Sequence, residues 1–332
     1  MKTAIIYHYF ERDEQYRDNL IYFLSVGLEA DVDYYFYLSS EATVEFPNMK
    51  NLKVTRIKNE NLDFGGVKSF SKEIGARDYD NLVFLNSSVR GPFLPTYANR
   101  PWHQCFTSKL SESTGLIGSS INELAVEDWF SVEFEKIYDY EPPFPHVQSY
   151  AYAISRSAYK HLYDFGFYEL EKVLNKDQII MRYEILQSQI LMGEGFSIGS
   201  LLPSQKKITR HKLEVSGLNC EVAEAPGSSS IMRDSYFGRT LSPLETIFIK
   251  PSVKALGRPI DHTALASFTM TGLLYSVPKI QLSNDAKSLL EKCKKIISNE
   301  NTRYYLLDEI PYLLQEIKNE RPDIARNLKK IL

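Results

Sequence analysis

The sequence predicts an α/β protein with an open, mostly parallel sheet flanked by helices and a C-terminal helical extension. Over roughly the first 250 of its 332 residues, short runs rich in β-branched and aromatic residues alternate with stretches of helical periodicity. This alternation is typical of parallel sheets. Beyond residue 255 only helical periodicity continues. The length suits one large domain with an addition, so we divide the chain into residues 1–255 and 256–332.

The expected elements follow in order along the chain. Residues 3–9 (TAIIYHY) form a β-rich run, and the next stretch carries a helical apolar stripe made by Tyr16, Leu20, Ile21, Phe23 and Leu24. Further strands are expected at residues 32–38, 52–57, 82–85, 115–118, 147–154 and 245–250. Further helices are expected at residues 63–74, from Ser155, and from an N-cap at Asp177 to Met192. Ligands of such sheets bind beyond the carboxyl ends of the strands, so residues that directly follow a strand are the first candidates for chemistry.

Charge and composition restrict the possible partners. A formal charge of −3 and a pI near 6.1 give no basic field for nucleic acid, so no nucleic-acid partner is expected. The three cysteines at positions 105, 220 and 293 form no C-x-x-C pair, which argues against a zinc site or a disulfide framework.

The sequence also predicts a cytoplasmic location. The first residues, MKTAIIYHYFERDE, turn acidic too early for a signal peptide, and no apolar run approaches the ~20 residues of a membrane span. The tail, IARNLKKIL, is basic and amphipathic. It is interpreted as a docking helix or as a peripheral contact with the inner face of a membrane.

One candidate ligand site is the stretch NENLDFGGVKSF, residues 59–70. Gly65 and Gly66 would let the backbone approach a ligand at a helix start, Asp63 could accept from a ribose hydroxyl or a base, and Lys68 could face phosphate. The alternative is an ordinary helix start in which Asp63 bonds its own backbone. Neither a P-loop nor a G-x-G-x-x-G fingerprint is present.

The second candidate is YDNLVFLNSSVRGPF, residues 79–93, where a strand stops in small polar side chains. Hard cations such as Mn or Mg need carboxylate oxygens, and Asn86, Ser87 and Ser88 offer only neutral ones. A divalent cofactor is therefore not required by this pattern. Arg90 could supply the positive charge that a diphosphate needs. The alternative is a simple polar turn before Gly91 and Pro92.

These stretches together resemble a known family. The order DFGG, then about twenty residues, then LNSSVRGPF, then HVQSY, with ETIFIK near residue 250, is similar to bacterial cell-surface polysaccharide glycosyltransferases related to the rhamnan-synthesis group. The resemblance covers roughly residues 1–250. It implies a GT-A fold and transfer of a sugar from a nucleotide-diphosphate sugar to a glycan or lipid-linked glycan acceptor. The products would be capsule, O-antigen of lipopolysaccharide, or a related surface polymer.

The resemblance also implies roles for particular residues. His8, Tyr9, Asp63 and the two glycines would hold the nucleotide, and the Asp-x-Asp position of the family falls on residues 86–88. Inverting members carry a base about eleven residues before a Gly-aromatic pair, and this spacing from Gly195 selects Glu184. A carboxylate suits deprotonation of the acceptor hydroxyl. Glu184 could instead be a solvated helix residue, and Asp177 is the competing base.

The remaining candidates lie in the middle of the chain. His146 and Gln148, in HVQSY, could bind acceptor or donor sugar. Residues 204–240 are expected to form a long loop or lid whose cations, Lys206, Lys207, Arg210 and His211, could clamp the diphosphate. The alternative is a solvated charge run. Two other functions stay open, namely a non-catalytic nucleotide- or glycan-binding module and transfer of a non-sugar group from a nucleotide donor.

Overall fold

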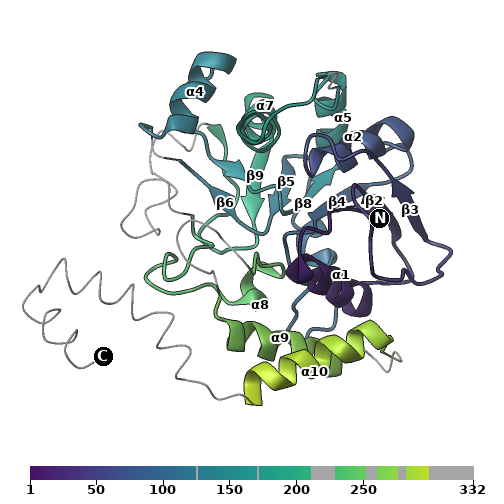
Figure 1. The fold of residues 1–332 in the computed structure, drawn as a ribbon. Coiled ribbons are helices and arrows are strands. Elements are labelled where there is room, and N and C mark those ends of the chain that lie inside the picture. The colour runs from purple at the N-terminus through teal and green to yellow at the C-terminus, as the bar shows by residue number, and fades with distance from the viewer. Residues whose placement is uncertain (125, 170–171, 211–228, 252–259, 276–281, 299–332) are drawn as a thin grey trace, which may run out of the picture.

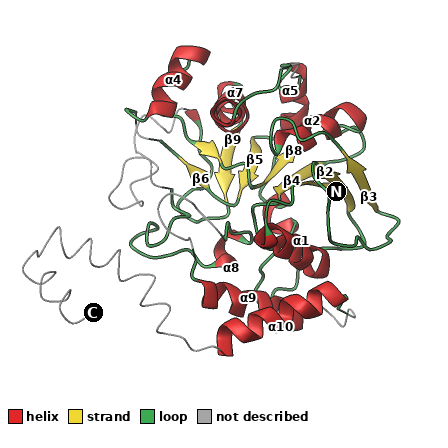
Figure 2. Ribbon diagram, viewed as in Figure 1, coloured by secondary structure: helices red, strands yellow, loops and turns green. Residues whose placement is uncertain are grey.

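The computed structural model describes residues 1–124, 126–169, 172–210, 229–251, 260–275 and 282–298. Its centre is a seven-stranded sheet in the order β3-β2-β1-β4-β8-β5-β9 (Figures 1 and 2). The strands are β1 (Thr3–Tyr9), β2 (Asp33–Leu38), β3 (Leu52–Arg56), β4 (Asn81–Asn86), β5 (Thr114–Gly118), β8 (Ala151–Ser155) and β9 (Ser197–Ser200). A separate pair is formed by β6 (Ile121–Asn122) and β7 (His146–Val147). The predicted α/β class is confirmed.

The sheet is parallel except at β8. β1 pairs in parallel with β2 and β4, and β5 pairs in parallel with β9. β8 runs antiparallel to both β4 and β5. The beginning of β8 therefore lies at the same edge of the sheet as the ends of β1 and β4, and residues 149–152 lie next to residue 86, with residue 8 on the other side of β4.

Helices cover both faces of the sheet. Figure 1 shows α2, α4, α5 and α7 on one side and α1, α8, α9 and α10 on the other. The first group comprises α2 (Phe64–Glu73), α4 (Trp129–Tyr138), α5 (Arg156–Asp164), α6 (Lys176–Ile179), the π-helical segment η1 (Ile180–Ile185) and α7 (Leu186–Gly193). The second comprises α1 (Glu14–Val26), α3 (Gln104–Thr107), α8 (Pro243–Thr246), α9 (His262–Tyr275) and α10 (Asn284–Ser298). Each face has its own apolar core, and alternate residues of the strands divide between the two cores.

Three expected elements are wrong in detail. The run 147–154 is interrupted, because only residues 146–147 and 151–155 pair as strands. The helix before Met192 is capped by Asn175, whose side chain accepts from Gln178 N, so Asp177 lies in the first turn rather than at the cap. The expected strand 245–250 begins as α8, since Ser242 and Glu245 form a capping box, and only Ile249 bridges to Arg90.

Gly91 explains why the chain can turn so sharply after β4. Its φ of +154° lies in a region that favours glycine. A Cβ at this position would lie 2.5 Å from the carbonyl oxygen of Ile247 and 2.5 Å from the Phe248 ring. The backbone of Arg90 also exchanges two hydrogen bonds with Ile249, at 2.8 and 3.0 Å. The turn is therefore clamped against the 247–249 segment.

The expected helices beyond residue 255 are present where that region is described. α9 and α10 pack on α1. Within the described residues, no helix is both long and apolar enough to cross a membrane. His211, Cys220 and the basic tail lie outside the described residues.

Candidate functional site

Three strands bring polar side chains to one edge of the sheet. His8, near the end of β1, is the register partner of Asn86, the last residue of β4. Tyr152, near the start of β8, pairs with Phe84. Because side chains alternate along a strand, His8, Asn86 and Tyr152 project toward the face covered by α2 and α7. We call this group, with Asp63 and Glu184, the edge cluster.

Asp63 enters the edge cluster from the turn before α2. The two preceding residues, Asn61 and Leu62, both have positive φ, of 60° and 51°. Such conformations are costly for residues other than glycine and are concentrated at functional sites. Asp63 makes no capping bond to its own helix, and its Oδ2 instead accepts from Asn86 Nδ2 at 2.5 Å. The alternative that Asp63 bonds its own backbone is therefore wrong.

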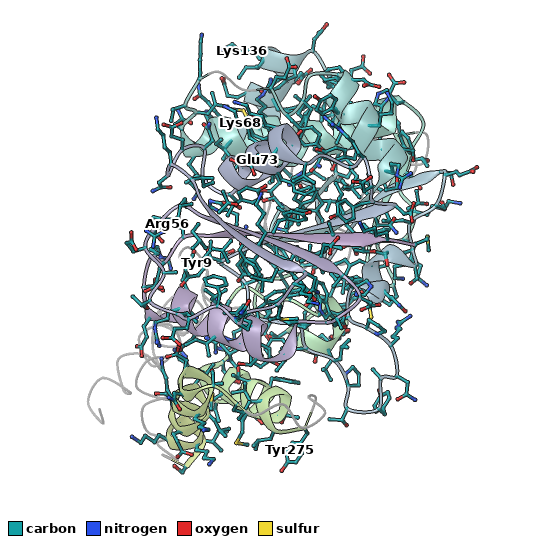
Figure 3. All side chains as sticks on the ribbon, turned by 90° about the vertical axis from the view of Figure 1, so that its right-hand side faces the viewer. Tyr9, Arg56, Lys68, Glu73, Lys136 and Tyr275 are labelled. Carbon is teal, nitrogen blue, oxygen red and sulfur yellow. The ribbon has the colours of Figure 1, made fainter. Side chains whose placement is uncertain are left out.

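The two glycines let the start of α2 come close to its neighbours. A Cβ on Gly65 would lie 2.5 Å from the carbonyl oxygen of Glu60, and one on Gly66 would lie 3.0 Å from the His8 side chain. Gly66 thus places α2 directly against His8. Lys68 lies further along α2, on the opposite side of the sheet from Tyr9 (Figure 3).

His8 is a buried and uncharged polar side chain. Its side chain is buried, and Nε2 has no hydrogen-bond partner among the described residues. Burial lowers the pKa of His8 to about 4, although the nearby Asp63 carboxylate acts in the opposite direction. Near pH 7 this imidazole is therefore uncharged, and its buried Nε2 is unpaired among the described residues.

Residues 86–88 form a turn that is closed by their own side chains. Asn86 Oδ1 accepts from the Ser88 amide at 3.0 Å and from the Ser88 hydroxyl at 2.5 Å. This is the polar turn that the sequence allowed as an alternative. Only Asn86 contributes a side chain to the edge cluster, since Ser87 Oγ accepts from the Phe10 amide at 3.2 Å.

Glu184 is the second carboxylate of the edge cluster. It lies in η1 and is partly buried, and Ser149 Oγ donates to its Oε2 at 3.1 Å. π-helical turns are frequent at functional sites, because the extra residue redirects side chains. Glu184 is close enough to His146 to raise its pKa, although burial dominates and lowers the pKa of His146 overall. Glu184 is therefore partly buried and hydrogen-bonded rather than fully solvated.

Tyr152 lies within electrostatic range of both carboxylates, and sequence reasoning missed it. Its hydroxyl is buried beside the Gln187 side chain. Burial raises the pKa of Tyr152, and Asp63 and Glu184 both raise it further, so the phenol stays protonated. The alternating run QSYAYAIS contained the available signal, because a tyrosine at the start of a central strand reaches the ligand edge.

The structure does not bring Arg90 or Tyr9 into the edge cluster. Arg90 is buried on the α1 side, where it pairs with Asp18, Asn19 and Thr269. Tyr9 lies in the apolar core of that same side, and its hydroxyl donates to Glu11 at 2.8 Å.

Several other candidates also have partners elsewhere. Asp177 is exposed, and the π-helical segment between it and Glu184 breaks the helical phase that would align the two carboxylates. Gln148 Oε1 accepts from Ser120 and Ser229, and His146 Nδ1 contacts the carbonyl oxygen of Phe144.

The described part of the expected clamp is not assembled at the edge cluster. The Arg210 guanidinium donates to the main-chain oxygens of Glu141 and Pro143 and to the Gln189 side chain. Lys206 and Lys207 are exposed. Arg210 therefore fastens the 141–143 turn.

The donor set at this edge fits a divalent metal ion poorly. Asp63 is the carboxylate beside the 86–88 turn, and the Asn86 oxygen is already engaged by Ser88. In the part of the chain that is described, no three histidine, cysteine, aspartate or glutamate side chains are grouped to hold a metal.

Comparisons with known proteins concern the fold. No family model matches the chain, and no curated protein matches its sequence. Similar solved structures are glycosyltransferases. The apo-form glycosyltransferase GlyE of Streptococcus pneumoniae TIGR4 is 11% identical with a TM-score of 0.30, and the match covers 60% of this chain and 45% of that one. The chain thus spans less than half the length of GlyE.

Two further solved structures are similar over more of their length. The galactosyltransferase LgtC, in complex with donor and acceptor sugar analogues, is 9% identical with a TM-score of 0.41, and the match covers 87% of this chain and 100% of that one. The mannosyltransferase PcManGT from Pyrobaculum calidifontis, in complex with GDP-Man and Mn²⁺, is 10% identical with a TM-score of 0.37. The match covers 99% of this chain and 79% of that one. At these values the likeness assigns no activity to this chain.

Proposed function

We propose that this protein is a glycosyltransferase that moves a sugar from a nucleotide-diphosphate sugar to a glycan acceptor, by direct displacement with inversion. The observation that carries the proposal is the edge cluster. It places two carboxylates, Asp63 and Glu184, within electrostatic range of the buried Tyr152 side chain, at the edge of a mostly parallel sheet where ligands bind. Two titratable groups in different surroundings suit two different tasks.

Asp63 and its neighbours form the donor side of the proposed site. The Asp63 carboxylate can accept from a ribose hydroxyl or a base, and Asn86 holds it in place. His8 Nε2, neutral and without a partner among the described side chains, supplies a further polar contact. The start of α2, which Gly65 and Gly66 bring close to Glu60 and His8, lies on the proposed diphosphate side, with Lys68 further along the helix.

Glu184 forms the acceptor side. As the acceptor oxygen attacks the anomeric carbon, the bond from that carbon to the diphosphate oxygen breaks, and Glu184 takes the proton of the acceptor hydroxyl. The nucleoside diphosphate leaves with the bonding electron pair. The Ser149 hydrogen bond orients the carboxylate, and His146 lies close to it.

The wider assignments belong to this proposal and rest on the sequence resemblance. They are a role in capsule, O-antigen or related surface polysaccharide synthesis, a cytoplasmic location with a peripheral membrane contact, and a transferase domain at residues 1–255 with an extension at residues 256–332. A glycan or lipid-linked glycan is the proposed acceptor.

Release of nucleoside diphosphate from nucleotide sugars tests the proposed activity. The protein should be incubated with UDP-, GDP-, dTDP- and ADP-linked sugars, with and without aryl glycosides as acceptors, in EDTA and in Mn²⁺. We expect at least one donor to be consumed faster with an acceptor present. Binding of a nucleotide without turnover under any of these conditions would favour the binding-module alternative, and failure to bind or consume any of them would contradict both functions.

A further inference from the structure

We propose that Asn19 is a positioning residue that holds the turn after β4, and that Arg90 holds Asn19 in place. The inference rests on the proposed function, because the turn carries Asn86 and thereby fixes Asp63 at the donor side. It assigns to Arg90 a task other than contact with the diphosphate.

Asn19 joins the turn to the buried arginine. Its side chain is fully buried in α1. Asn19 Nδ2 donates to the main-chain oxygen of Ser87 at 3.0 Å, and Asn19 Oδ1 accepts from Arg90 Nε at 3.0 Å. Both ends of one amide are thus used, and a flipped or absent amide would leave a buried donor or acceptor without its partner.

The C-terminal helices satisfy the other side of the arginine. Arg90 NH1 donates to Thr269 Oγ1 of α9 at 3.4 Å, and Arg90 NH2 lies 3.7 Å from the Asp18 carboxylate. Lys292 of α10 completes the charge balance, with its Nζ 2.6 Å from Asp18 and 2.9 Å from Glu14. Figure 1 shows α9 and α10 lying against α1 on the side away from the sheet.

Removing a partner from this arrangement is costly, because it leaves a buried charge without compensation. Ion pairs and hydrogen bonds connect α10 through Asp18, Arg90 and Asn19 to the Ser87 carbonyl. The residue before Ser87 is Asn86, whose side chain holds Asp63. Asn19 therefore supports the turn that positions Asp63.

Three substitutions separate positioning from general stability. Asn19→Asp keeps an acceptor for Arg90 but loses the donor to Ser87. Arg90→Lys keeps a positive charge beside Asp18 but loses the Nε bond to Asn19, and it serves as the second variant should Asn19→Asp fail to fold. Thr269→Val is the matched control, since it removes the Arg90–Thr269 bond and leaves Asn19 and Ser87 joined.

Amide hydrogen exchange measured without any ligand is the first readout. The Ser88 amide, which donates to Asn86 Oδ1, should exchange at least about tenfold faster in Asn19→Asp and Arg90→Lys and within about twofold of the original in Thr269→Val. Thr269→Val should nevertheless lower the unfolding midpoint. Unchanged exchange at Ser88 in Asn19→Asp and Arg90→Lys, or an equal increase in Thr269→Val, would overturn the proposal.

Affinity for UDP and GDP, measured by calorimetry, is the second readout. For whichever of UDP and GDP the original protein binds, we expect the affinity of Asn19→Asp to be at least about fivefold weaker. The affinity of Thr269→Val should stay within twofold of the original. If the original protein binds neither, the proposed function loses its support, while the exchange result still decides whether Asn19 positions the turn.

Discussion

Replacing Glu184 with glutamine should lower sugar transfer by about 10²- to 10⁴-fold, the usual contribution of a general base. Glutamine keeps the shape and can still accept from the Ser149 hydroxyl, so the fold and the affinity for nucleoside diphosphate should stay within about twofold. The measurement is the initial rate of transfer from the preferred nucleotide sugar to the preferred aryl glycoside. Slow hydrolysis of the donor can persist in this variant, because water does not need the same base.

Asp177→Asn is the matched control for Glu184→Gln. Asp177 is the competing carboxylate, it is exposed, and Asn175 rather than Asp177 caps the helix. We expect its transfer rate to stay within about twofold of the original. A large loss in Asp177→Asn together with near-normal transfer in Glu184→Gln would reverse the assignment of the base.

The burial of His8 should make stability strongly dependent on pH. The pKa of His8 is about 4 in the folded protein, whereas an imidazole that is exposed in the unfolded chain has a pKa of 6.5. Between these values the unfolded chain binds a proton that the folded chain does not, so the free energy of unfolding falls as the pH falls. Over the whole window the loss is about 3 kcal/mol.

Urea unfolding of the original protein and of His8→Gln, at intervals from pH 7.5 to pH 4, isolates this effect. Other groups titrate equally in both proteins, so the difference between the two unfolding free energies should change by about 3 kcal/mol over the window, in favour of His8→Gln at low pH. Two curves that stay parallel would show that His8 is not held neutral by burial.

The fold was largely predictable, because its signals are local. The β-rich runs at 3–9, 32–38 and 52–57 each became a strand within one residue of the expected limits. The prediction of a strand at residues 245–250 was wrong, because it gave more weight to the apolar composition of this run than to a competing helix-start signal. Ser242, Pro243 and Glu245 form a recognisable helix start, and this start takes the first half of the run into α8.

The candidate site was less predictable, because its composition depends on tertiary contacts. Sequence reasoning selected Asp63, Asn86 and His8 from their places after or near strand ends, and the structure groups them. It could not tell that Arg90 turns to the opposite side of the sheet, since that direction follows from buried partners on α1 and α9. Asn19 gave no signal, because it follows Asp18 and falls outside the expected apolar stripe, where a polar residue normally faces solvent.

Calorimetric titration with UDP, GDP, CDP and ADP in the presence of EDTA, on the original protein and on Asp63→Asn, tests the central claim most directly. That claim is that the edge cluster binds a nucleoside diphosphate through Asp63 without needing a metal ion. We predict binding of at least one of the four by the original protein and at least about tenfold weaker binding by Asp63→Asn, because a charge-assisted hydrogen bond is lost. Equal affinity of the two proteins, or no binding of any nucleotide unless Mn²⁺ is added, would contradict the account.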